Sequence, residues 1–297
     1  MIERRHHLDS LAIVLLVGCC ALWALNQIAM KWLLAEMPAL QQAAARSLGA
    51  AVLVWLWARW RGIRLFERDG TAFGGLLAGA LFAAEFACIF IGLQYTSASR
   101  MLVFIYIAPF VVALGMPFIA RSERLSPAQF AGLSLAFAGV AWAFAEGFTQ
   151  PAVGDRQWLG DALGIAAGVL WGATTLAVRG TRLTSASAEK TLLYQLAVSG
   201  VLLALAVALQ GQPLATRMSW FAWGTLAFQT VIVAFASFLL WFWLIRHYPA
   251  TRLSSFTLLT PVFGLLFGAL LLAEPITPRL MLAVAAVAAG IVMVNRR

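Results

Sequence analysis

Ten apolar runs, each about as long as a membrane-spanning helix, occupy almost the entire chain and are separated by short connectors. A helix needs about 20 mostly apolar residues to cross a bilayer. Only 11% of the residues are charged and 62% are hydrophobic, whereas a soluble domain is about 25% charged. The sequence therefore predicts an all-α integral membrane protein with ten transmembrane helices, at 10–33, 39–59, 72–95, 98–119, 127–145, 158–180, 188–209, 219–246, 250–272 and 277–295.

Basic residues give the chain a formal net charge of +9. They are scattered over the connectors and form no continuous stripe, so they do not predict a nucleic-acid partner. Most of the 21 Lys and Arg residues fall on the side of the membrane on which the ten spans place both chain ends. Because cytoplasmic loops carry the excess of Lys and Arg, we expect a multi-pass protein of the bacterial inner (plasma) membrane with both termini in the cytoplasm.

Residues that could support catalysis or hold a metal are scarce within the spans. No histidine falls in the middle of a span, and the cysteines Cys19, Cys20 and Cys88 lie inside apolar runs, where we expect buried thiols and no disulfide. A nucleophile with its base, or a metal-ligand set, cannot be assembled there. We therefore expect no enzyme activity, no cofactor and no metal. The first apolar run is too long for the core of a cleavable signal peptide, so none is expected.

The second half of the chain echoes the first at a nearly constant offset. The matching sets are Trp23, Asn26, Gln27 with Trp171, Thr174, Thr175; Arg100, Phe104, Pro109 with Arg252, Phe256, Pro261; and Glu123, Pro127, Gly139 with Glu274, Pro278, Gly290. The sequence thus predicts two repeats, residues 1–148 and 149–297. Each has five spans, an odd number, so the second repeat must be inverted. Inverted repeats are the basis of alternating access in many transporters, although an old duplication kept only for packing is the alternative.

Short motifs recur in the two repeats in the same order. The first copy has the segment 95–98, then Pro109, Glu123 and Pro127, and the second has the segment 248–251, then Pro261, Glu274 and Pro278. In these motifs the chain resembles EamA domains of the drug/metabolite transporter superfamily, and Arg46 in the second span also fits the pattern. It most resembles the bacterial aromatic amino-acid exporters of the YddG type. The resemblance implies a central cavity lined mainly by spans 1, 3, 4, 6, 8 and 9, and outward movement of amino acids.

One face of the first span carries four candidate substrate-binding residues, Trp23, Asn26, Gln27 and Met30. Residues spaced i, i+3, i+4 and i+7 share a helix face, and amides in lipid are costly, so Asn26 and Gln27 should face protein or water. We expect a substrate wall, with a hydrogen bond between helices as the alternative. The corresponding wall of the sixth span is Trp171, Thr174 and Thr175.

Glu85 is the one acidic residue that the predicted spans place deep in the membrane. Ionisable residues at that depth are usually functional. We expect Glu85 to bind a substrate ammonium or to carry a coupling proton. A neutral acid or a structural ion pair is the alternative.

Further candidates are distributed over three spans. Those for the substrate wall are Met101, Phe104, Ile105, Phe235, Leu239, Trp243, Ser254, Ser255 and Leu258, each of which could instead serve only packing. Pro109 and Pro261 lie inside spans, where proline bends a helix, and we expect a pair of hinges, with static kinks as the alternative. Glycines four residues apart, from Gly160 to Gly172 and again at Gly264 and Gly268, predict close helix packing.

Together these patterns predict an alternating-access transporter that exports amino acids, aromatic or other hydrophobic ones, across the inner membrane. The alternative is an exporter of other small metabolites or of cationic drugs, with proton coupling left open. A channel fits less well, because channels commonly use charged rings or carbonyl filters shared by several subunits. The expected partners are the small-molecule substrate and the lipid bilayer, and we expect the protein to work as a monomer.

Overall fold

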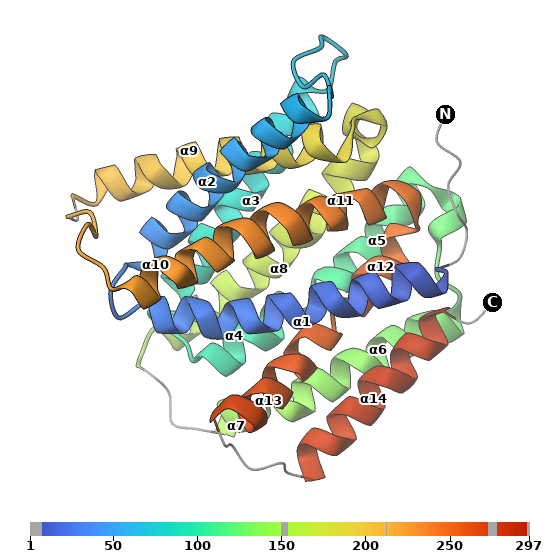
Figure 1. The fold of residues 1–297 in the computed structure, drawn as a ribbon. Coiled ribbons are helices and arrows are strands. Elements are labelled where there is room, and N and C mark those ends of the chain that lie inside the picture. The colour runs from blue at the N-terminus through green and yellow to red at the C-terminus, as the bar shows by residue number, and fades with distance from the viewer. Residues whose placement is uncertain (1–7, 150–153, 212, 273–277, 296–297) are drawn as a thin grey trace.

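The computed structural model describes residues 8–149, 154–211, 213–272 and 278–295, which form a bundle of helices joined by short connectors (Figure 1). These ranges contain no strand. The helices are α1 (Ser10–Leu33), α2 (Ala39–Trp60), α3 (Ala72–Gly92), α4 (Ala98–Ile105), α5 (Ala108–Ile119), η1 (Arg121–Glu123), α6 (Pro127–Ala143), α7 (Glu146–Thr149), α8 (Gln157–Gly180), η2 (Arg182–Ser185), α9 (Ala188–Leu209), α10 (Trp220–Ala227), η3 (Phe228–Ser237), α11 (Phe238–His247), α12 (Ala250–Phe256), α13 (Leu259–Leu272) and α14 (Pro278–Asn295).

Every predicted span coincides with a helix or with a run of consecutive helices. Within the described residues, seven such segments are long and apolar enough to cross a membrane: Ser10–Met30, Ala72–Gly92, Arg100–Ile119, Gln157–Gly180, Ala188–Leu209, Trp220–His247 and Ala250–Phe267. Pro127–Ala143 and Met281–Asn295 are shorter apolar helices. α2 buries Gln41, Gln42 and Arg46, and it is less apolar than α1 or α3. The all-helical, multi-pass membrane architecture is confirmed, while the ten-span inverted repeat stays a prediction.

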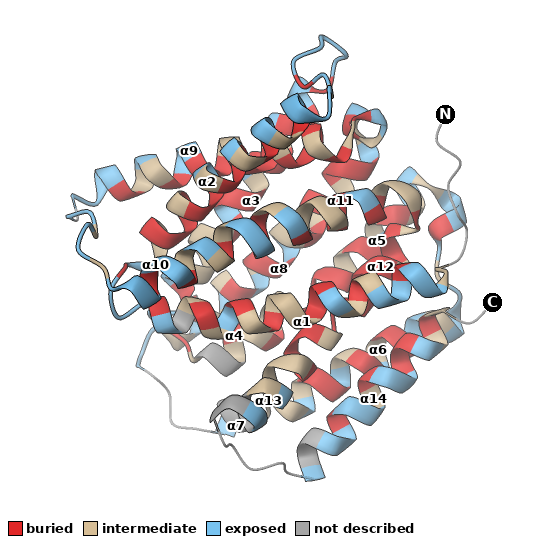
Figure 2. Ribbon diagram, in the orientation of Figure 1, coloured by how far each residue is buried: buried red, intermediate tan, exposed pale blue. Residues whose placement is uncertain are grey.

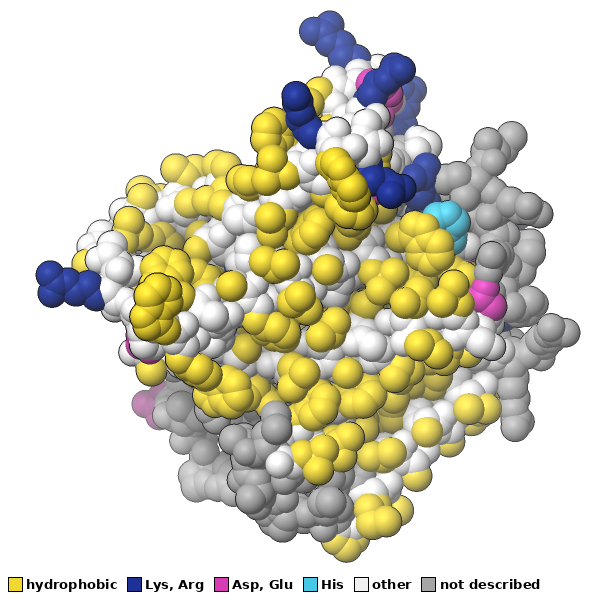
Figure 3. All heavy atoms as spheres, in the orientation of Figure 1, with side chains coloured by type: hydrophobic (Ala, Val, Ile, Leu, Met, Phe, Trp, Pro, Cys, Tyr) yellow, Lys and Arg dark blue, Asp and Glu magenta, His cyan; other side chains and the backbone are white. Residues whose placement is uncertain are grey.

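Large apolar side chains cover the outside of the bundle. Phe118 and Trp220 are each 92% exposed. In Figure 3 apolar side chains spread over the face shown, and the Lys and Arg side chains gather at its periphery. In Figure 2, buried and exposed residues alternate along α1, α11 and α14. A continuous exposed apolar surface of this kind suits lipid as its solvent.

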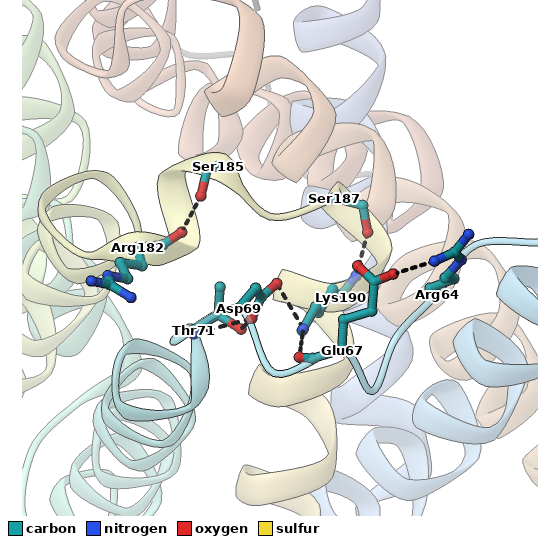
Figure 4. Close-up of polar contacts among 8 residues, drawn as sticks. All are labelled: Arg64, Glu67, Asp69, Thr71, Arg182, Ser185, Ser187 and Lys190. Atoms are coloured by element: carbon teal, nitrogen blue, oxygen red, sulfur yellow. Dashed lines mark hydrogen bonds and ion pairs between the residues drawn. The ribbon is translucent and has the colours of Figure 1, made fainter. Parts of the chain in front are cut away.

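Contacts between connectors fall into two sets, one at each end of the helices. At one end, Lys190 in the first turn of α9 donates from Nζ to Asp69 at 2.8 Å (Figure 4). Asp69 lies in the connector between α2 and α3. At the other end Ser219 Oγ, just before α10, donates at 2.7 Å to Glu36, which follows α1. The beginning of α1 and the end of α14 lie at the same end of the bundle (Figure 1). Consequently α1, α2 and α3 alternate in direction, as do α9 and α10.

Two predicted spans are broken at corresponding places. The fourth span is interrupted at Tyr106 and Ile107, between α4 and α5, and the ninth at Thr257 and Leu258, between α12 and α13. A proline follows each break within three residues, Pro109 in α5 and Pro261 in α13. Proline has no N–H to donate to the carbonyl four residues before it, so the helical ladder is lost there. The structure thus breaks both spans close to the prolines expected to bend them; the use of these prolines as hinges stays a prediction.

The eighth predicted span is not a uniform α-helix. Between α10 and α11 the chain forms the π-helical stretch η3 (Phe228–Ser237). π-Helical turns often occur at functional sites. Gln229, within this stretch, is fully buried, and neither of its side-chain polar atoms has a hydrogen-bond partner among the described residues.

The glycines of α8 allow close helix contact, as predicted. A methyl group at Gly168 would lie 2.6 Å from Ile107 Cγ1 and 2.7 Å from the carbonyl oxygen of Phe104. The ridge therefore holds α8 against the broken helix α4–α5. The same prediction is wrong at Gly264, where an added methyl would meet nothing within 4 Å. Gly268 lies outside the residues whose surroundings are described.

Candidate substrate-binding site

The α1 face predicted as a substrate wall points mostly into the bundle. Asn26 is buried, and its Nδ2 donates weakly to Met30 Sδ at 3.4 Å, while its Oδ1 has no partner among the described residues. Trp23 is half-buried and donates from Nε1 to Ser237 Oγ at 3.0 Å. Gln27 is exposed, so it does not share this environment. One face of α1 thus carries an aromatic ring that contacts η3 and a buried amide that contacts Met30.

Glu85 of α3 is buried, and its Oε2 atom has no hydrogen-bond partner in the described part of the chain. It interacts electrostatically with Arg46 of α2, which is 3% exposed. The two side chains form no direct ion pair within the described ranges. Instead, the Arg46 guanidinium lies 4.5 Å from the centre of the Phe86 ring, with Nη1 4.0 Å from Met30 Sδ. Met30 therefore contacts both Asn26 and Arg46 and links the α1 wall to the charged residues.

Aromatic rings continue from these charges toward Trp23. Phe86 packs edge-on against Phe82 with ring centres 4.8 Å apart, and Phe82 meets Phe238 at 6.2 Å. Phe238 in turn meets Trp23 at 6.2 Å, again edge-on. Edge-to-face pairs at such distances are favourable. We call Trp23, Phe238, Phe82 and Phe86 the aromatic row; it joins α1, α3 and α11.

The corresponding residues of α8 lie against another part of the first half. Trp171 packs edge-on against Tyr106 with ring centres 5.6 Å apart, at the break between α4 and α5. Thr174 is buried and donates to the carbonyl of Leu170 in its own helix, and Thr175 is buried nearby. Trp23 and Trp171 both pack against the main apolar core, with different ring partners: Phe238 and Trp241 for Trp23, and Tyr106 for Trp171.

The candidates of α4 fill the interface with α8. A methyl group at Gly164 would lie 3.0 Å from Phe104 Cβ and 3.2 Å from Met101 Sδ. Phe104 also meets the Phe148 ring at 5.8 Å, and Ile105 ends the helix as a half-buried residue. Met101 and Phe104 thus pack against α8.

The remaining candidates are dispersed along α11, η3 and α12. Those that pack into or against the main apolar core are Phe235, Leu239 and Leu258. Trp243 is 37% exposed and stacks on His247 near the end of α11. Ser254 is buried, and Ser255 is buried and donates to the carbonyl of Arg252 in its own helix. Among the described residues, no hydrogen bond, ion pair or ring contact links these side chains directly to Glu85 or Arg46.

A second buried charge cluster lies where α8 ends. Arg179 pairs with Glu123 of η1 and donates from Nη1 to the carbonyl of Ile245 at 2.8 Å. Glu123 also accepts from the backbone N–H of Thr251 at 3.2 Å. A pocket of about 100 Å³ opens beside this pair. The neighbouring arginines Arg121 and Arg124 are exposed, and the cation that pairs with Glu123 is Arg179. Glu274, the predicted counterpart of Glu123, lies outside the described residues.

Sequence reasoning on the site missed Arg46, Phe82, Phe86, Ser237 and Phe238. The signal was present for Arg46, because a guanidinium inside a predicted span raises the same question as the Glu85 carboxylate. The phenylalanines carried no such signal, since they resemble the apolar residues around them. Within the described residues, no cluster of three or more His, Cys, Asp or Glu side chains could hold a metal ion.

Comparison with known proteins gives consistent matches over the whole length. The family model described as the EamA-like transporter family matches residues 10–145 and again 158–296. An uncharacterized transporter of Synechocystis sp. is 30% identical, with 93% of this chain and 87% of the relative covered. An uncharacterized transporter of Archaeoglobus fulgidus is 24% identical, with 88% and 89% covered. A solved crystal structure superposes with a TM-score of 0.82 at 19% identity, covering 96% of both chains, and so shares the fold.

Proposed function

The chain belongs to the EamA-like transporter family, and from this premise we propose that it is an alternating-access carrier that exports amino acids, aromatic or other hydrophobic ones, across the bacterial inner membrane. Its relatives indicate a transporter rather than an enzyme. The observation that carries the proposal is the unpaired carboxylate of Glu85 beside the aromatic row. A buried acid without a hydrogen-bond partner is costly unless a ligand satisfies it.

The proposed architecture is two inverted repeats, residues 1–148 and 149–297. Two observations support it: the same family model matches each half, and the breaks in the fourth and ninth spans correspond. Two similar units in opposite orientation can pack in two nearly equivalent ways, one open to each side of the membrane. We propose that this exchange carries substrate across, with both chain ends in the cytoplasm and the protein acting as a monomer.

An aromatic amino acid suits the chemistry around Glu85. The acid offers a partner for an ammonium group, and the aromatic row offers an apolar, polarisable surface for a ring. A sugar would need many hydrogen-bond partners, which this surface lacks. We therefore place the substrate-binding site between α1, α2 and α3, with Trp23, Asn26 and Met30 of the original candidates contributing.

A second candidate function is export of cationic drugs or other small metabolites, with proton coupling left open. It is favoured by the same Glu85 carboxylate, which would neutralise any organic cation. The two functions differ in whether the substrate must carry a carboxylate.

Substrate competition in proteoliposomes tests the proposal. Purified protein is reconstituted, loaded with labelled phenylalanine, and challenged outside with each amino acid, a sugar or a quaternary amine. We expect phenylalanine and tryptophan to drive saturable counterflow more strongly than sugars or quaternary amines. Equal rates for all these compounds would defeat the amino-acid assignment, and non-saturable flux would indicate a channel.

The Glu85→Gln variant tests the role of the acid. We expect it to fold, because the change is nearly isosteric, and to transport phenylalanine more slowly than the unchanged protein. Glu67→Gln, which changes an exposed acid in a connector, is the matched control. A fully active Glu85→Gln protein would remove Glu85 from the site.

The path of the chain back and forth across the membrane can be tested with single cysteines at exposed connector positions. Ser122→Cys lies at the end that we assign to the cytoplasm, and Arg217→Cys at the opposite end. In intact cells a membrane-impermeant thiol reagent should modify Arg217→Cys and spare Ser122→Cys. Modification of both positions from outside would contradict the alternating path.

A further inference from the structure

Three cationic side chains are buried in the described part of the chain, and two of them are neutralised by acids. Arg179 pairs with Glu123, and Lys190 donates to Asp69 at 2.8 Å. Arg46 differs from both, because its guanidinium pairs with no carboxylate in the described ranges. A guanidinium has five N–H donors, and here the hydrogen-bonding contact described for it is a weak one, to the Met30 sulfur at 4.0 Å. Its Nε has no partner.

Glu85, the acid that interacts with Arg46, also lacks a hydrogen-bond partner in the part of the chain that the structure describes. It is 7% exposed, its Oε2 has no donor among the described residues, and it interacts with Arg46 only through space. A structural ion pair in a low-dielectric interior would be expected to close into direct hydrogen bonds, as the Arg179–Glu123 pair does. Arg46 and Glu85 instead form no direct ion pair in the described part of the chain, although both are buried and each keeps a polar atom without a hydrogen-bond partner there.

The chemical class that satisfies both side chains at once is a zwitterion with its two charges close together. We propose that Arg46 binds the carboxylate and Glu85 the ammonium group of an α-amino acid, so that Arg46 is the residue that makes the carrier select amino acids over organic cations. The inference rests on the proposed export of amino acids and specifies which residues recognise the substrate backbone.

The surroundings of the two charges orient the rest of the substrate. Phe86 lies beneath the Arg46 guanidinium at 4.5 Å and holds its plane by a cation–π contact. From Phe86 the aromatic row leads through Phe82 and Phe238 to Trp23. The substrate side chain lies along this row, while its backbone charges lie between α2 and α3. Asn26 lies next to Met30, and its Oδ1 has no partner in the described structure. It adds a further hydrogen-bonding group at the end of the site that holds the substrate's backbone charges.

Three compounds with one ring and different charges separate the two roles. Phenylalanine has both charges, phenethylamine lacks the carboxylate, and phenylpropionate lacks the ammonium group. We expect the unchanged carrier to transport phenylalanine faster than either analogue. In Arg46→Gln, phenylalanine transport should fall by about tenfold or more, the effect of losing a charge-assisted bond, while phenethylamine transport changes much less. The ratio of the two rates is the readout.

Two control variants distinguish recognition from folding. Arg179→Gln removes a buried guanidinium elsewhere, and Arg217→Gln removes an exposed one; both should leave the ratio of phenylalanine to phenethylamine transport unchanged. Glu85→Gln should slow both amine-bearing compounds and spare phenylpropionate. If Arg46→Gln slows phenylalanine and phenethylamine by the same factor, Arg46 does not bind the carboxylate and the inference is wrong.

A measurement on the unchanged protein keeps the inference testable if Arg46→Gln fails to fold. Phenethylamine and phenylpropionate should each compete with labelled phenylalanine far more weakly than unlabelled phenylalanine does. Equal competition by phenethylamine would overturn the role of Arg46 while leaving amino-acid transport intact. If the unchanged carrier transports no amino acid at all, the proposed function itself fails, and that outcome is distinct from either of the others.

Discussion

Arg179, near the end of α8, forms a buried ion pair with Glu123, which lies after α5 in the first half of the chain. The same Glu123 carboxylate accepts from the backbone N–H of Thr251 at the start of α12, and the same Arg179 guanidinium donates to the carbonyl of Ile245 in α11. The pair therefore joins one connector of the first half to three helices of the second half, at the end of the bundle where the chain begins.

Breaking this pair should destabilise the protein. Arg179→Gln leaves the Glu123 carboxylate buried without its cation, and removal of one partner of a buried pair costs about 3–5 kcal/mol. We expect a clear fall in the midpoint of thermal unfolding in detergent. Arg121→Gln, which changes an exposed arginine two residues from Glu123, should unfold like the unchanged protein. Equal midpoints for the two variants would show that the pair contributes nothing to stability.

Trp23 should govern affinity for aromatic substrates. Trp23→Ala removes the ring that meets Phe238 at 6.2 Å and Trp241 at 5.4 Å, together with the hydrogen bond to Ser237. If the substrate ring lies on the aromatic row, the concentration of phenylalanine needed for half-maximal counterflow should rise by about tenfold, which corresponds to about 1.4 kcal/mol.

Two further variants make the Trp23 result specific. Trp23→Phe keeps a ring but loses the hydrogen bond, and it should fall between Trp23→Ala and the unchanged protein. Trp220→Ala removes a tryptophan that is 92% exposed and should have no effect on counterflow. If Trp23→Ala needs the same phenylalanine concentration for half-maximal counterflow as the unchanged protein, the substrate ring does not lie on the aromatic row.

The close approach of α8 to α4–α5 should be sensitive to a single methyl group. In Gly168→Ala the new methyl would lie 2.7 Å from the Phe104 carbonyl oxygen, a backbone atom that cannot move cheaply. Overpacking of this kind costs about 1–3 kcal/mol. Gly264→Ala is the matched control, because its methyl would meet nothing within 4 Å. We expect Gly168→Ala to unfold at a lower temperature than Gly264→Ala; the reverse order would refute the packing seen here.

The connector contact between Asp69 and Lys190 predicts a defined pH dependence of stability. Hydrogen bonds from Lys190 and Thr71 hold the pKa of Asp69 well below its usual value. A carboxylate with a depressed folded-state pKa stabilises the protein above the unfolded-state pKa, about 3.9, and loses that contribution as the pH falls toward the folded-state value.

The measurement is the difference in unfolding midpoint between the unchanged protein and Asp69→Asn. It should be constant from neutral pH down to about pH 5 and shrink below about pH 4, where the unfolded chain takes up the proton. Asp155→Asn, at an exposed carboxylate in another connector, should show a smaller difference throughout. A difference that grows on acidification would have the wrong sign for this ion pair.

The positions of the helices could be predicted from the sequence alone. The expected spans 39–59 and 188–209 are observed as Ala39–Trp60 and Ala188–Leu209. This agreement has a physical reason: crossing a membrane depends on the length and apolarity of one continuous segment. The sequence also predicted bends at Pro109 and Pro261 for a local reason, since each proline removes a donor from its own helix, and the helices break close to both.

The partners of the buried charges were decided by the tertiary structure. In a helix that is apolar on all sides, periodicity does not indicate which face turns inward, so the sequence could mark Glu85 as costly without showing that Arg46 and Phe86 lie beside it. In the same way it could suggest that Glu123 pairs, but not that its cation is Arg179 rather than its exposed neighbours Arg121 and Arg124. The sequence by itself determined which segments enter the membrane, because that is a property of each segment; which side chains meet inside depends on how the helices pack against one another, and only the folded structure decides that.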